Sequence, residues 1–78
     1  MTEDTLFAMA RDVPIRGDMI RLGQLLKVAG VIDSSGEAKA FLASSTVLVN
    51  GEPESRRGRQ LRAGDEVRAG GELLRITG

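Results

Sequence analysis

The residues best suited to chemistry in this chain are the arginines of one short segment. Residues 55–62, Ser-Arg-Arg-Gly-Arg-Gln-Leu-Arg, contain four Arg and no acidic residue. Guanidinium groups donate forked hydrogen bonds to phosphate oxygens, and their weak hydration keeps the cost of doing so low. Gly58 allows the segment to bend and a ligand to approach its backbone. The segment is a candidate phosphate-binding loop. Its candidate ligand residues are Arg56, Arg57 and Arg59, with Arg62 in support.

A plainer interpretation exists for the same segment. Runs of charge usually face water and pair with nearby opposite charges. Glu52, Glu54 and Asp65 are close enough in sequence to neutralise these arginines. Charge alone favours this solvated loop over a binding site, so the choice depends on other features of the chain.

Two lysines and a helix start could extend the same surface. Lys27 and Lys39 lie on two expected helices, and each alone is most simply a surface lysine. Gly36 stands at the start of the second helix, where exposed amides and the helix dipole favour a phosphate. Ser34 and Glu37 could instead satisfy those amides, which would leave no site there. Together with the arginines, these residues could form one basic face.

The composition argues against most other chemistry. The chain has no Cys and no His, which removes thiol nucleophiles, thiolate metal sites and the commonest general base. Phe7 and Phe41 are its only aromatic residues, so no aromatic platform is available for stacking bases. The acids at positions 52–54 and 65–66 flank turns and look exposed, which argues against acid–base catalysis. We therefore expect no enzyme, no cofactor and no metal site.

Size and charge narrow the class of protein. The 78 residues are about half a typical domain, and 41% of them are apolar, which is enough for one small core. Eleven basic residues balance eleven acidic ones, so nucleic-acid binding would need a local patch. No apolar run approaches about 18 residues, and the acidic N-terminus does not match a secretory signal. We expect a cytoplasmic protein with no membrane partner and no small-molecule substrate. Residues 1–10 should be a loose end, and residues 11–78 a single domain.

Helical periodicity occurs twice in the first half of the chain. Residues 21–29 place four apolar side chains on one helical face. Residues 34–44 repeat this pattern with Phe41 in the core, and Ser34 with Glu37 predicts a capping box. Because few residues join the two helices, they should pack as a compact pair.

The other segments have the period of strands. Turn residues and period two predict strands at 11–16, 47–49, 52–54, 66–69 and 72–76. Pro14 makes the first an edge strand, since proline lacks a ladder donor. Asn50-Gly51 and Gly70-Gly71 predict tight hairpin turns, and Leu61 should re-enter the core between them. The pattern therefore predicts an α+β fold, two packed helices followed by a small antiparallel sheet.

Five short sequence pieces stand in an order and at separations typical of one family. They are residues 20–27, 35–39, 47–52, 56–59 and 64–67. Through them, residues 15–70 resemble the S-four-like RNA-binding domain, or alpha-L RNA-binding motif, in its small bacterial form. The resemblance implies two packed helices leading into a small curled sheet. It also implies binding of structured RNA, with ribosomal RNA a candidate, by the second helix and the hairpin loops that follow.

The resemblance also assigns roles by position. It points to Lys39 on the second helix and to the loop arginines Arg56, Arg57 and Arg59, and it places Lys27 near the same face. Ser35 stands where many members have Arg, so no phosphate contact is carried over to that position. With this resemblance, the arginine segment is better interpreted as an RNA contact than as a solvated loop.

These arguments predict a non-enzymatic module that recognises structured RNA through phosphate and shape contacts. The alternative is a protein-interaction module that docks on a ribosome-associated or enzyme complex, which the zero net charge and mixed Glu/Arg surface would suit. DNA binding is a variant of the first prediction. Competition between duplex RNA and duplex DNA would separate the two, because only RNA carries 2′-hydroxyls.

Overall fold

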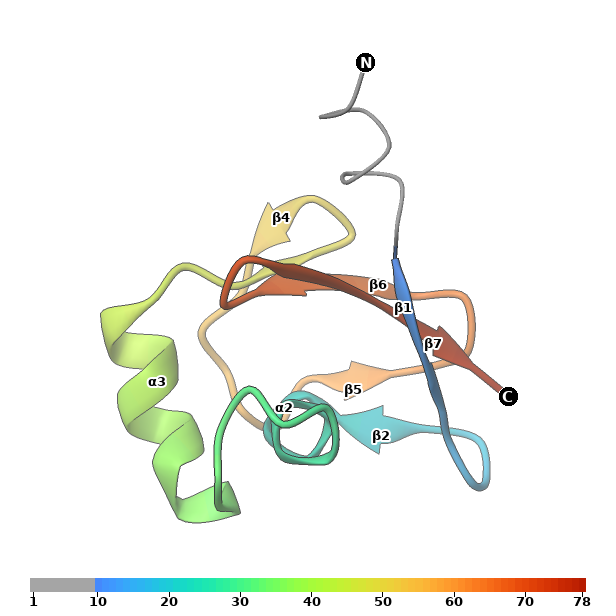
Figure 1. Ribbon diagram of the computed structural model, residues 1–78, viewed down its shortest axis with the longest axis horizontal. Helices are drawn as coiled ribbons and strands as arrows, with labels where there is room; N and C mark the ends of the chain where they lie inside the picture. The colour runs from blue at the N-terminus through green and yellow to red at the C-terminus, as the bar shows by residue number, and fades with distance from the viewer. Residues whose placement is uncertain (1–9) are drawn as a thin grey trace.

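The computed structural model describes residues 10–78, in which short helices and short strands share one core (Figure 1). The expectation of a loose N-terminal segment falls almost entirely on residues 1–9, which lie outside the described part. In chain order the elements are β1 (Arg11–Pro14), β2 (Ile20–Arg21), α2 (Leu22–Val28), η1 (Ser35–Glu37), α3 (Ala38–Ser44), β3 (Leu48–Val49), β4 (Glu52–Pro53), β5 (Gln60–Leu61), β6 (Glu66–Ala69) and β7 (Glu72–Thr77). The α+β class is thus confirmed.

The main sheet is mixed rather than antiparallel. Its strand order is β1-β7-β6-β3-β4, and β1 runs parallel to β7 at one edge, with Val13 opposite Ile76. The prediction of helices followed by an antiparallel sheet was wrong on this point, because the chain begins the sheet before it forms the helices. The edge position expected from Pro14 agrees with the structure. A second, two-stranded sheet pairs β2 with β5, and the sequence pattern did not predict it.

The helices lie where the apolar periodicity placed them. In α2, Leu22, Leu25 and Leu26 are fully buried. The second helix begins with the single 3₁₀ turn η1 and continues as α3. The predicted capping box is wrong, since the Ser34 side chain caps nothing. The Glu37 carboxylate instead accepts from the Asp33 amide at 2.8 Å, one residue before the expected partner.

The core lies between the helices and the inner face of the main sheet. Its largest fully buried side chains are Leu22, Leu25, Leu26, Leu61, Leu74, Ile76, Val47, Val49 and Val67. Leu61 is buried as predicted, whereas Phe41 is only partly buried and packs against the edge of the core. At about 25 cal/mol per Å² of apolar surface, burial of this set is the main stabilising term in so small a domain.

Both predicted hairpin turns are present. Asn50 and Gly51 have φ values of 52° and 86°, and Gly70 and Gly71 have 59° and 78°. These left-handed conformations are those a two-residue turn requires, and they match the twist of the flanking strands. The turns bring β4 beside β3 and β7 beside β6. Within residues 10–78, every helix is too short or too polar to cross a bilayer.

Candidate functional site

Three cations surround a hollow where α2, η1 and the loop between β4 and β5 meet. Arg21, Lys27 and Arg57 line this hollow of about 540 Å³, with Gly36 and Gly58 on its walls. Among the described residues, no acidic side chain lines it. We call it the cation hollow. Such a cluster is suited to phosphate groups, because each guanidinium and ammonium offers several donors and the local field is positive.

Residues 54–59, between β4 and β5, form a loop that we call the arginine loop. Its backbone is hydrogen-bonded to the start of α2. The amide of Leu22 donates to the Arg59 carbonyl, and the amide of Gly23 donates to the Arg57 carbonyl, each at 2.9 Å. The first amides of a helix have no partner inside the helix, so these two bonds satisfy the helix and fix the loop together. They place Arg57 beside the helix that carries Lys27.

Gly23 makes this close approach possible. A Cβ added at Gly23 would lie 3.2 Å from the Ala38 Cβ and 3.3 Å from the Arg57 Cβ. Both distances are tighter than ordinary carbon contacts, so a larger residue would push apart the helix α3 and the arginine loop. A single glycine therefore joins three elements around the cation hollow.

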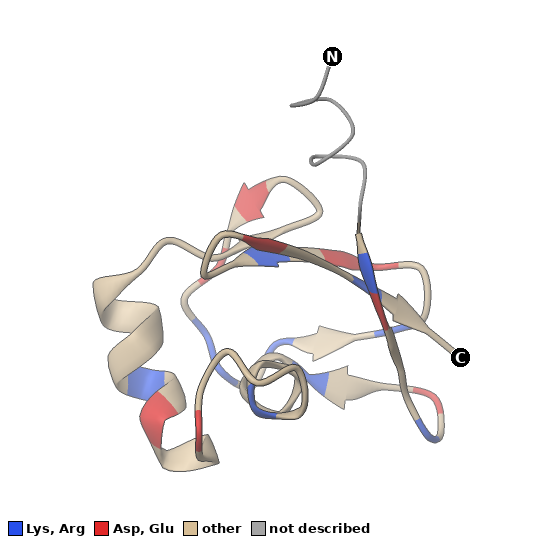
Figure 2. Cartoon of the chain, in the orientation of Figure 1, with Lys and Arg blue, Asp and Glu red and all other residues tan. Residues whose placement is uncertain are grey.

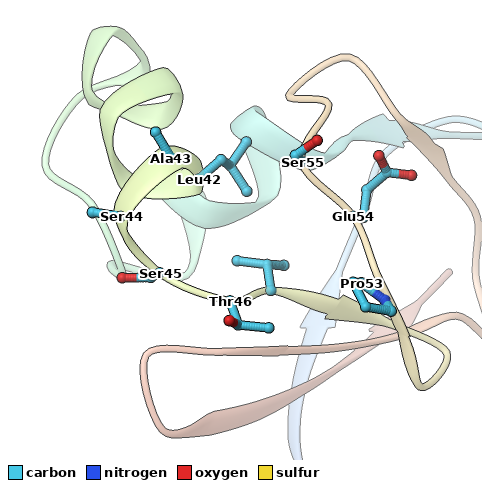
Figure 3. A pocket seen from close by; sticks show the side chains of 9 residues that line it. Leu42, Ala43, Ser44, Ser45, Thr46, Pro53, Glu54 and Ser55 are labelled. Atoms are coloured by element: carbon cyan, nitrogen blue, oxygen red, sulfur yellow. The ribbon is translucent and has the colours of Figure 1, made fainter.

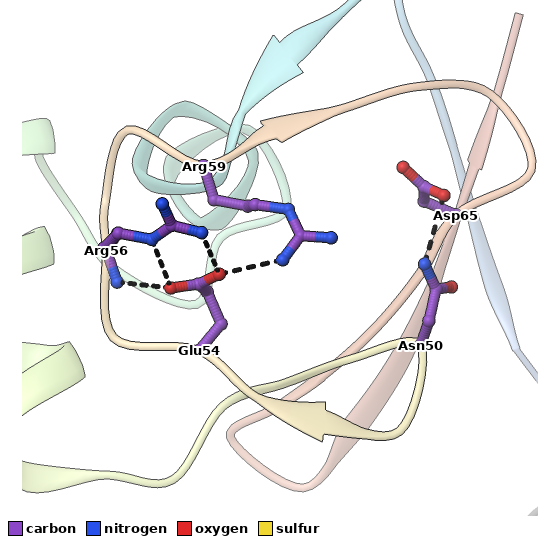
Figure 4. A network of polar contacts seen from close by, with 5 residues as sticks. All are labelled: Asn50, Glu54, Arg56, Arg59 and Asp65. Atoms are coloured by element: carbon purple, nitrogen blue, oxygen red, sulfur yellow. Dashed lines mark hydrogen bonds and ion pairs between the residues drawn. The ribbon is translucent and has the colours of Figure 1, made fainter.

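Glu54 binds two of the loop arginines (Figure 4). Its carboxylate accepts from Arg56 Nε at 3.0 Å and Nη2 at 3.1 Å, and from Arg59 Nη1 at 2.8 Å. The backbone amide of Arg56 also donates to it at 2.9 Å. The Glu54 side chain is only 8% exposed, so the expectation that this acid is exposed was wrong. The pairing with Glu54 that the plainer interpretation expected is thus present for Arg56 and Arg59.

These bonds change the acidity of the Glu54 carboxyl. Hydrogen bonds from the Arg56 side chain, the Arg56 amide and the Arg59 side chain hold the pKa of Glu54 far below its ordinary value. The same contact raises the pKa of Arg56. All three groups therefore stay charged at neutral pH, and together they carry one net positive charge.

A second basic hollow of about 520 Å³ lies against the same loop. Its lining residues are Arg56, Gly58, Arg59 and Gln60. Gly58 lines both basic hollows, so they adjoin at this residue. The Glu54 carboxylate is absent from the lining although it bonds both arginines. We call this second hollow the loop hollow.

Charge is unevenly distributed over the molecule. Figure 2 shows basic positions on β2, on α2 and on the loop that passes beside it, an acidic position on β4, and both acidic and basic positions along β6 and β7. Another hollow, beneath Val31 and Phe41, is rimmed by Asp33 and Glu37. A protein with zero net charge thus presents a basic region made of a few residues.

Comparison with known proteins agrees with this architecture. Residues 13–77 match the S4 domain family. The chain is also 56% identical, over 59 residues, to the "Probable ribosome maturation protein RlbA" of Bacillus subtilis (strain 168). That match covers 76% of this chain and 83% of the relative. The chain belongs to the S4 domain family.

The S4 domain brings together only part of the residue set predicted from sequence. Lys27, Gly36 and Arg57 meet at the cation hollow. Arg56 and Arg59 lie at the loop hollow with Glu54 behind them. All five therefore lie around one loop and the helix beside it.

Two other predicted residues lie apart from these hollows. Lys39 is exposed on α3, next to Ala38 of the cation hollow but outside the lining. Arg62 lies beyond β5, where its backbone amide donates to Asp65 at 2.8 Å. Neither lines one of the two basic hollows.

Arg21 is a lining residue that sequence reasoning missed. The periodicity placed it inside the first helix, whereas it belongs to β2 and pairs with Gln60 of β5. That pairing turns Arg21 toward the loop. Helical spacing could not have found it, because Arg21 belongs to a strand of only two residues.

A further hollow at the C-terminal end of α3 has a different character (Figure 3). It measures about 320 Å³, and hydroxyls of Ser45, Thr46 and Ser55 lie around it with Glu54. Because this hollow has no basic side chain in its lining, it does not share the phosphate-binding chemistry of the two basic hollows.

Proposed function

We propose that this S4 domain binds structured RNA, with ribosomal RNA the first candidate, by seating backbone phosphates in the cation hollow. The observation that carries the proposal is the grouping of Arg21, Lys27 and Arg57, without an acid in the lining, in a protein of zero net charge. The Bacillus subtilis relative is named as a probable ribosome maturation protein, which supports ribosomal RNA as the class of ligand.

The composition of the surface defines how such an RNA is recognised. Sequence-specific binding of single strands usually stacks bases on aromatic side chains. Phe41 is the one aromatic residue among residues 10–78, and it packs against the core. We therefore expect contacts to phosphate and sugar, which recognise the position and shape of a folded backbone.

The test compares two double variants that lose the same charge. Lys27→Ala/Arg57→Ala removes two cations of the cation hollow, whereas Arg16→Ala/Arg68→Ala removes two exposed cations outside its lining. Affinity for a ribosomal RNA stem-loop is measured by fluorescence anisotropy over a series of salt concentrations. The wild-type plot of log K against log salt should have a slope of about −2 to −3, from two to four phosphates.

The two variants should separate clearly. The variant Lys27→Ala/Arg57→Ala, which we call the hollow variant, should lose at least about tenfold in RNA affinity. Its salt slope should shrink by about 2, because each lost phosphate contact removes about one unit of slope. The control should change affinity by less than about threefold. Equal losses in both variants, or no loss in the hollow variant, would contradict the proposal.

Sedimentation with ribosomal particles distinguishes docking on a protein from binding to RNA. Protein bound through RNA should leave the particle fraction after nuclease treatment. It should also be absent from that fraction in the hollow variant. Co-sedimentation that survives both changes would favour a protein-interaction module instead.

A further inference from the structure

We propose that Glu54 is a positioning residue, which holds Arg56 and Arg59 as a second phosphate subsite in the loop hollow. This inference rests on the proposed function, since it concerns how the same RNA backbone is bound. It assigns a role to an acid within a basic loop, where an acid would ordinarily weaken the binding of an anion.

The bonds to Glu54 leave most of each guanidinium available. A guanidinium has five N–H donors. Within residues 10–78, Glu54 takes two from the Arg56 side chain and one from Arg59. The Arg56 side chain remains 73% exposed and that of Arg59 36% exposed, while Glu54 itself is 8% exposed. The arginines are thus fixed from behind and still face solvent with free donors.

The charge balance of this cluster also suits an anion. One carboxylate and two guanidinium groups leave one net positive charge, and most of the exposed surface of the cluster belongs to the two arginines. An arginine held in one geometry loses less conformational entropy when it binds a phosphate, because a long free side chain gives up much of its rotamer freedom on binding. Glu54 therefore lowers the cost of binding while it reduces the charge.

The position of the loop hollow fits a second phosphate of the same backbone. Gly58 lines both hollows, and a Cβ added there would have no atom within 4 Å. The Gly58 backbone thus stands in open space where the two basic hollows adjoin, and an RNA strand can approach it closely. Arg57 serves one side, while Arg56 and Arg59 serve the other.

The test uses two acid-to-amide changes of equal charge. Glu54→Gln removes the carboxylate that binds the arginines. Glu52→Gln removes an exposed acid that makes no ion pair among residues 10–78. Both raise the net charge by one. If charge alone mattered, both would tighten binding to the RNA stem-loop. If Glu54 positions the arginines, Glu54→Gln should weaken binding about threefold to tenfold and reduce the salt slope, while Glu52→Gln should not weaken it.

A second background separates positioning from a general loss of structure. In Arg56→Ala/Arg59→Ala, the residues on which Glu54 acts are gone, so adding Glu54→Gln should leave RNA affinity unchanged within about twofold. An equal loss in both backgrounds would mean that Glu54 acts through the fold and would overturn the inference. Tighter binding by Glu54→Gln in the wild-type background would also overturn it.

If Glu54→Gln does not fold, a charge-conserving variant tests whether RNA binding needs the arginine geometry that Glu54 fixes. Arg56→Lys/Arg59→Lys keeps the two charges but loses the forked geometry that Glu54 fixes. We expect it to bind about threefold to tenfold more weakly than wild type, and unchanged affinity would overturn the inference. The proposed function is tested separately. It would be contradicted if Lys27→Ala/Arg57→Ala bound the RNA stem-loop as tightly as the wild-type protein does.

Discussion

Glu54 makes the stability of the arginine loop depend on pH. Its pKa is lowered in the folded protein, so the ionised carboxylate stabilises the fold above the ordinary value of 4.5. This contribution is lost as the pH falls below that value, because protonation weakens the bonds to Arg56 and Arg59. At neutral pH it should amount to about 1 kcal/mol, since both arginines remain partly solvated.

The measurement is urea unfolding of wild type and Glu54→Gln between pH 7 and pH 3. The free energy of unfolding should differ by about 1 kcal/mol at pH 7, and the difference should shrink toward pH 3. Because the two proteins differ only at this carboxyl group, any pH dependence that they share cancels in the difference. A difference that stays constant with pH would show that the ionised form of Glu54 contributes nothing.

The sequence could name the basic residues but not their separate environments. Arg56, Arg57 and Arg59 are equivalent as letters in a charge run, and the family resemblance assigned all three to the same expected RNA contact. In the structure their environments differ. Arg56 and Arg59 donate to Glu54, whereas Arg57 is held beside α2 by the hydrogen bond from the Gly23 amide to its carbonyl. Such a division depends on side-chain direction at a loop, which has no periodicity to reveal it.

At the scale of elements, the contact between α2 and the arginine loop is the most sensitive part of the site. Gly23→Val should destabilise the protein by about 2 kcal/mol, because the new side chain meets Ala38 and Arg57 within 3.3 Å of its first carbon. Gln24→Val is the control, since it introduces the same residue at the next, exposed position of the same helix. Chemical unfolding of both variants gives the comparison. Because valine has a higher helix propensity than glycine, propensity alone would stabilise Gly23→Val, and an unchanged or raised stability of that variant would contradict the packing argument.

Elements with a clear local signal were predicted, and those without one were not. The helices and both hairpins follow from apolar period and from turn residues that accept positive φ. The pair β2–β5 has two residues on each side, which is too short for a period. The parallel pairing of β1 with β7 joins residues more than 60 positions apart, and no local pattern encodes it.

At the scale of the molecule, the small aromatic content predicts a preference for folded RNA. The S4 domain has one aromatic residue in its described part, packed at the core edge, so unpaired bases gain no stacking energy on its surface. A stem-loop should bind at least about tenfold more tightly than an unstructured oligouridine of equal length. Competition at fixed salt measures this, and equal affinity would indicate binding by charge alone.

The net charge indicated that any RNA binding needs a local basic patch, but it could not indicate where on the surface such a patch lies. A total of zero required a local basic patch for any RNA binding, and the structure has basic hollows around one loop. Their extent could not be predicted, because Lys39 and Arg62 belong to surfaces whose direction depends on tertiary packing. The family resemblance pointed to this region as an expected RNA contact, and the packing around Gly23 and Glu54 determines which cations lie together in it.

The central place of β7 affects how the domain folds. This strand lies between β6, its neighbour in the sequence, and β1, whose residues lie more than 60 positions earlier. Loop-closure entropy must be overcome before the β1–β7 pair gains its hydrogen bonds. The pairing of β1 should therefore be a late step of folding, after the helices and the β6–β7 hairpin have formed.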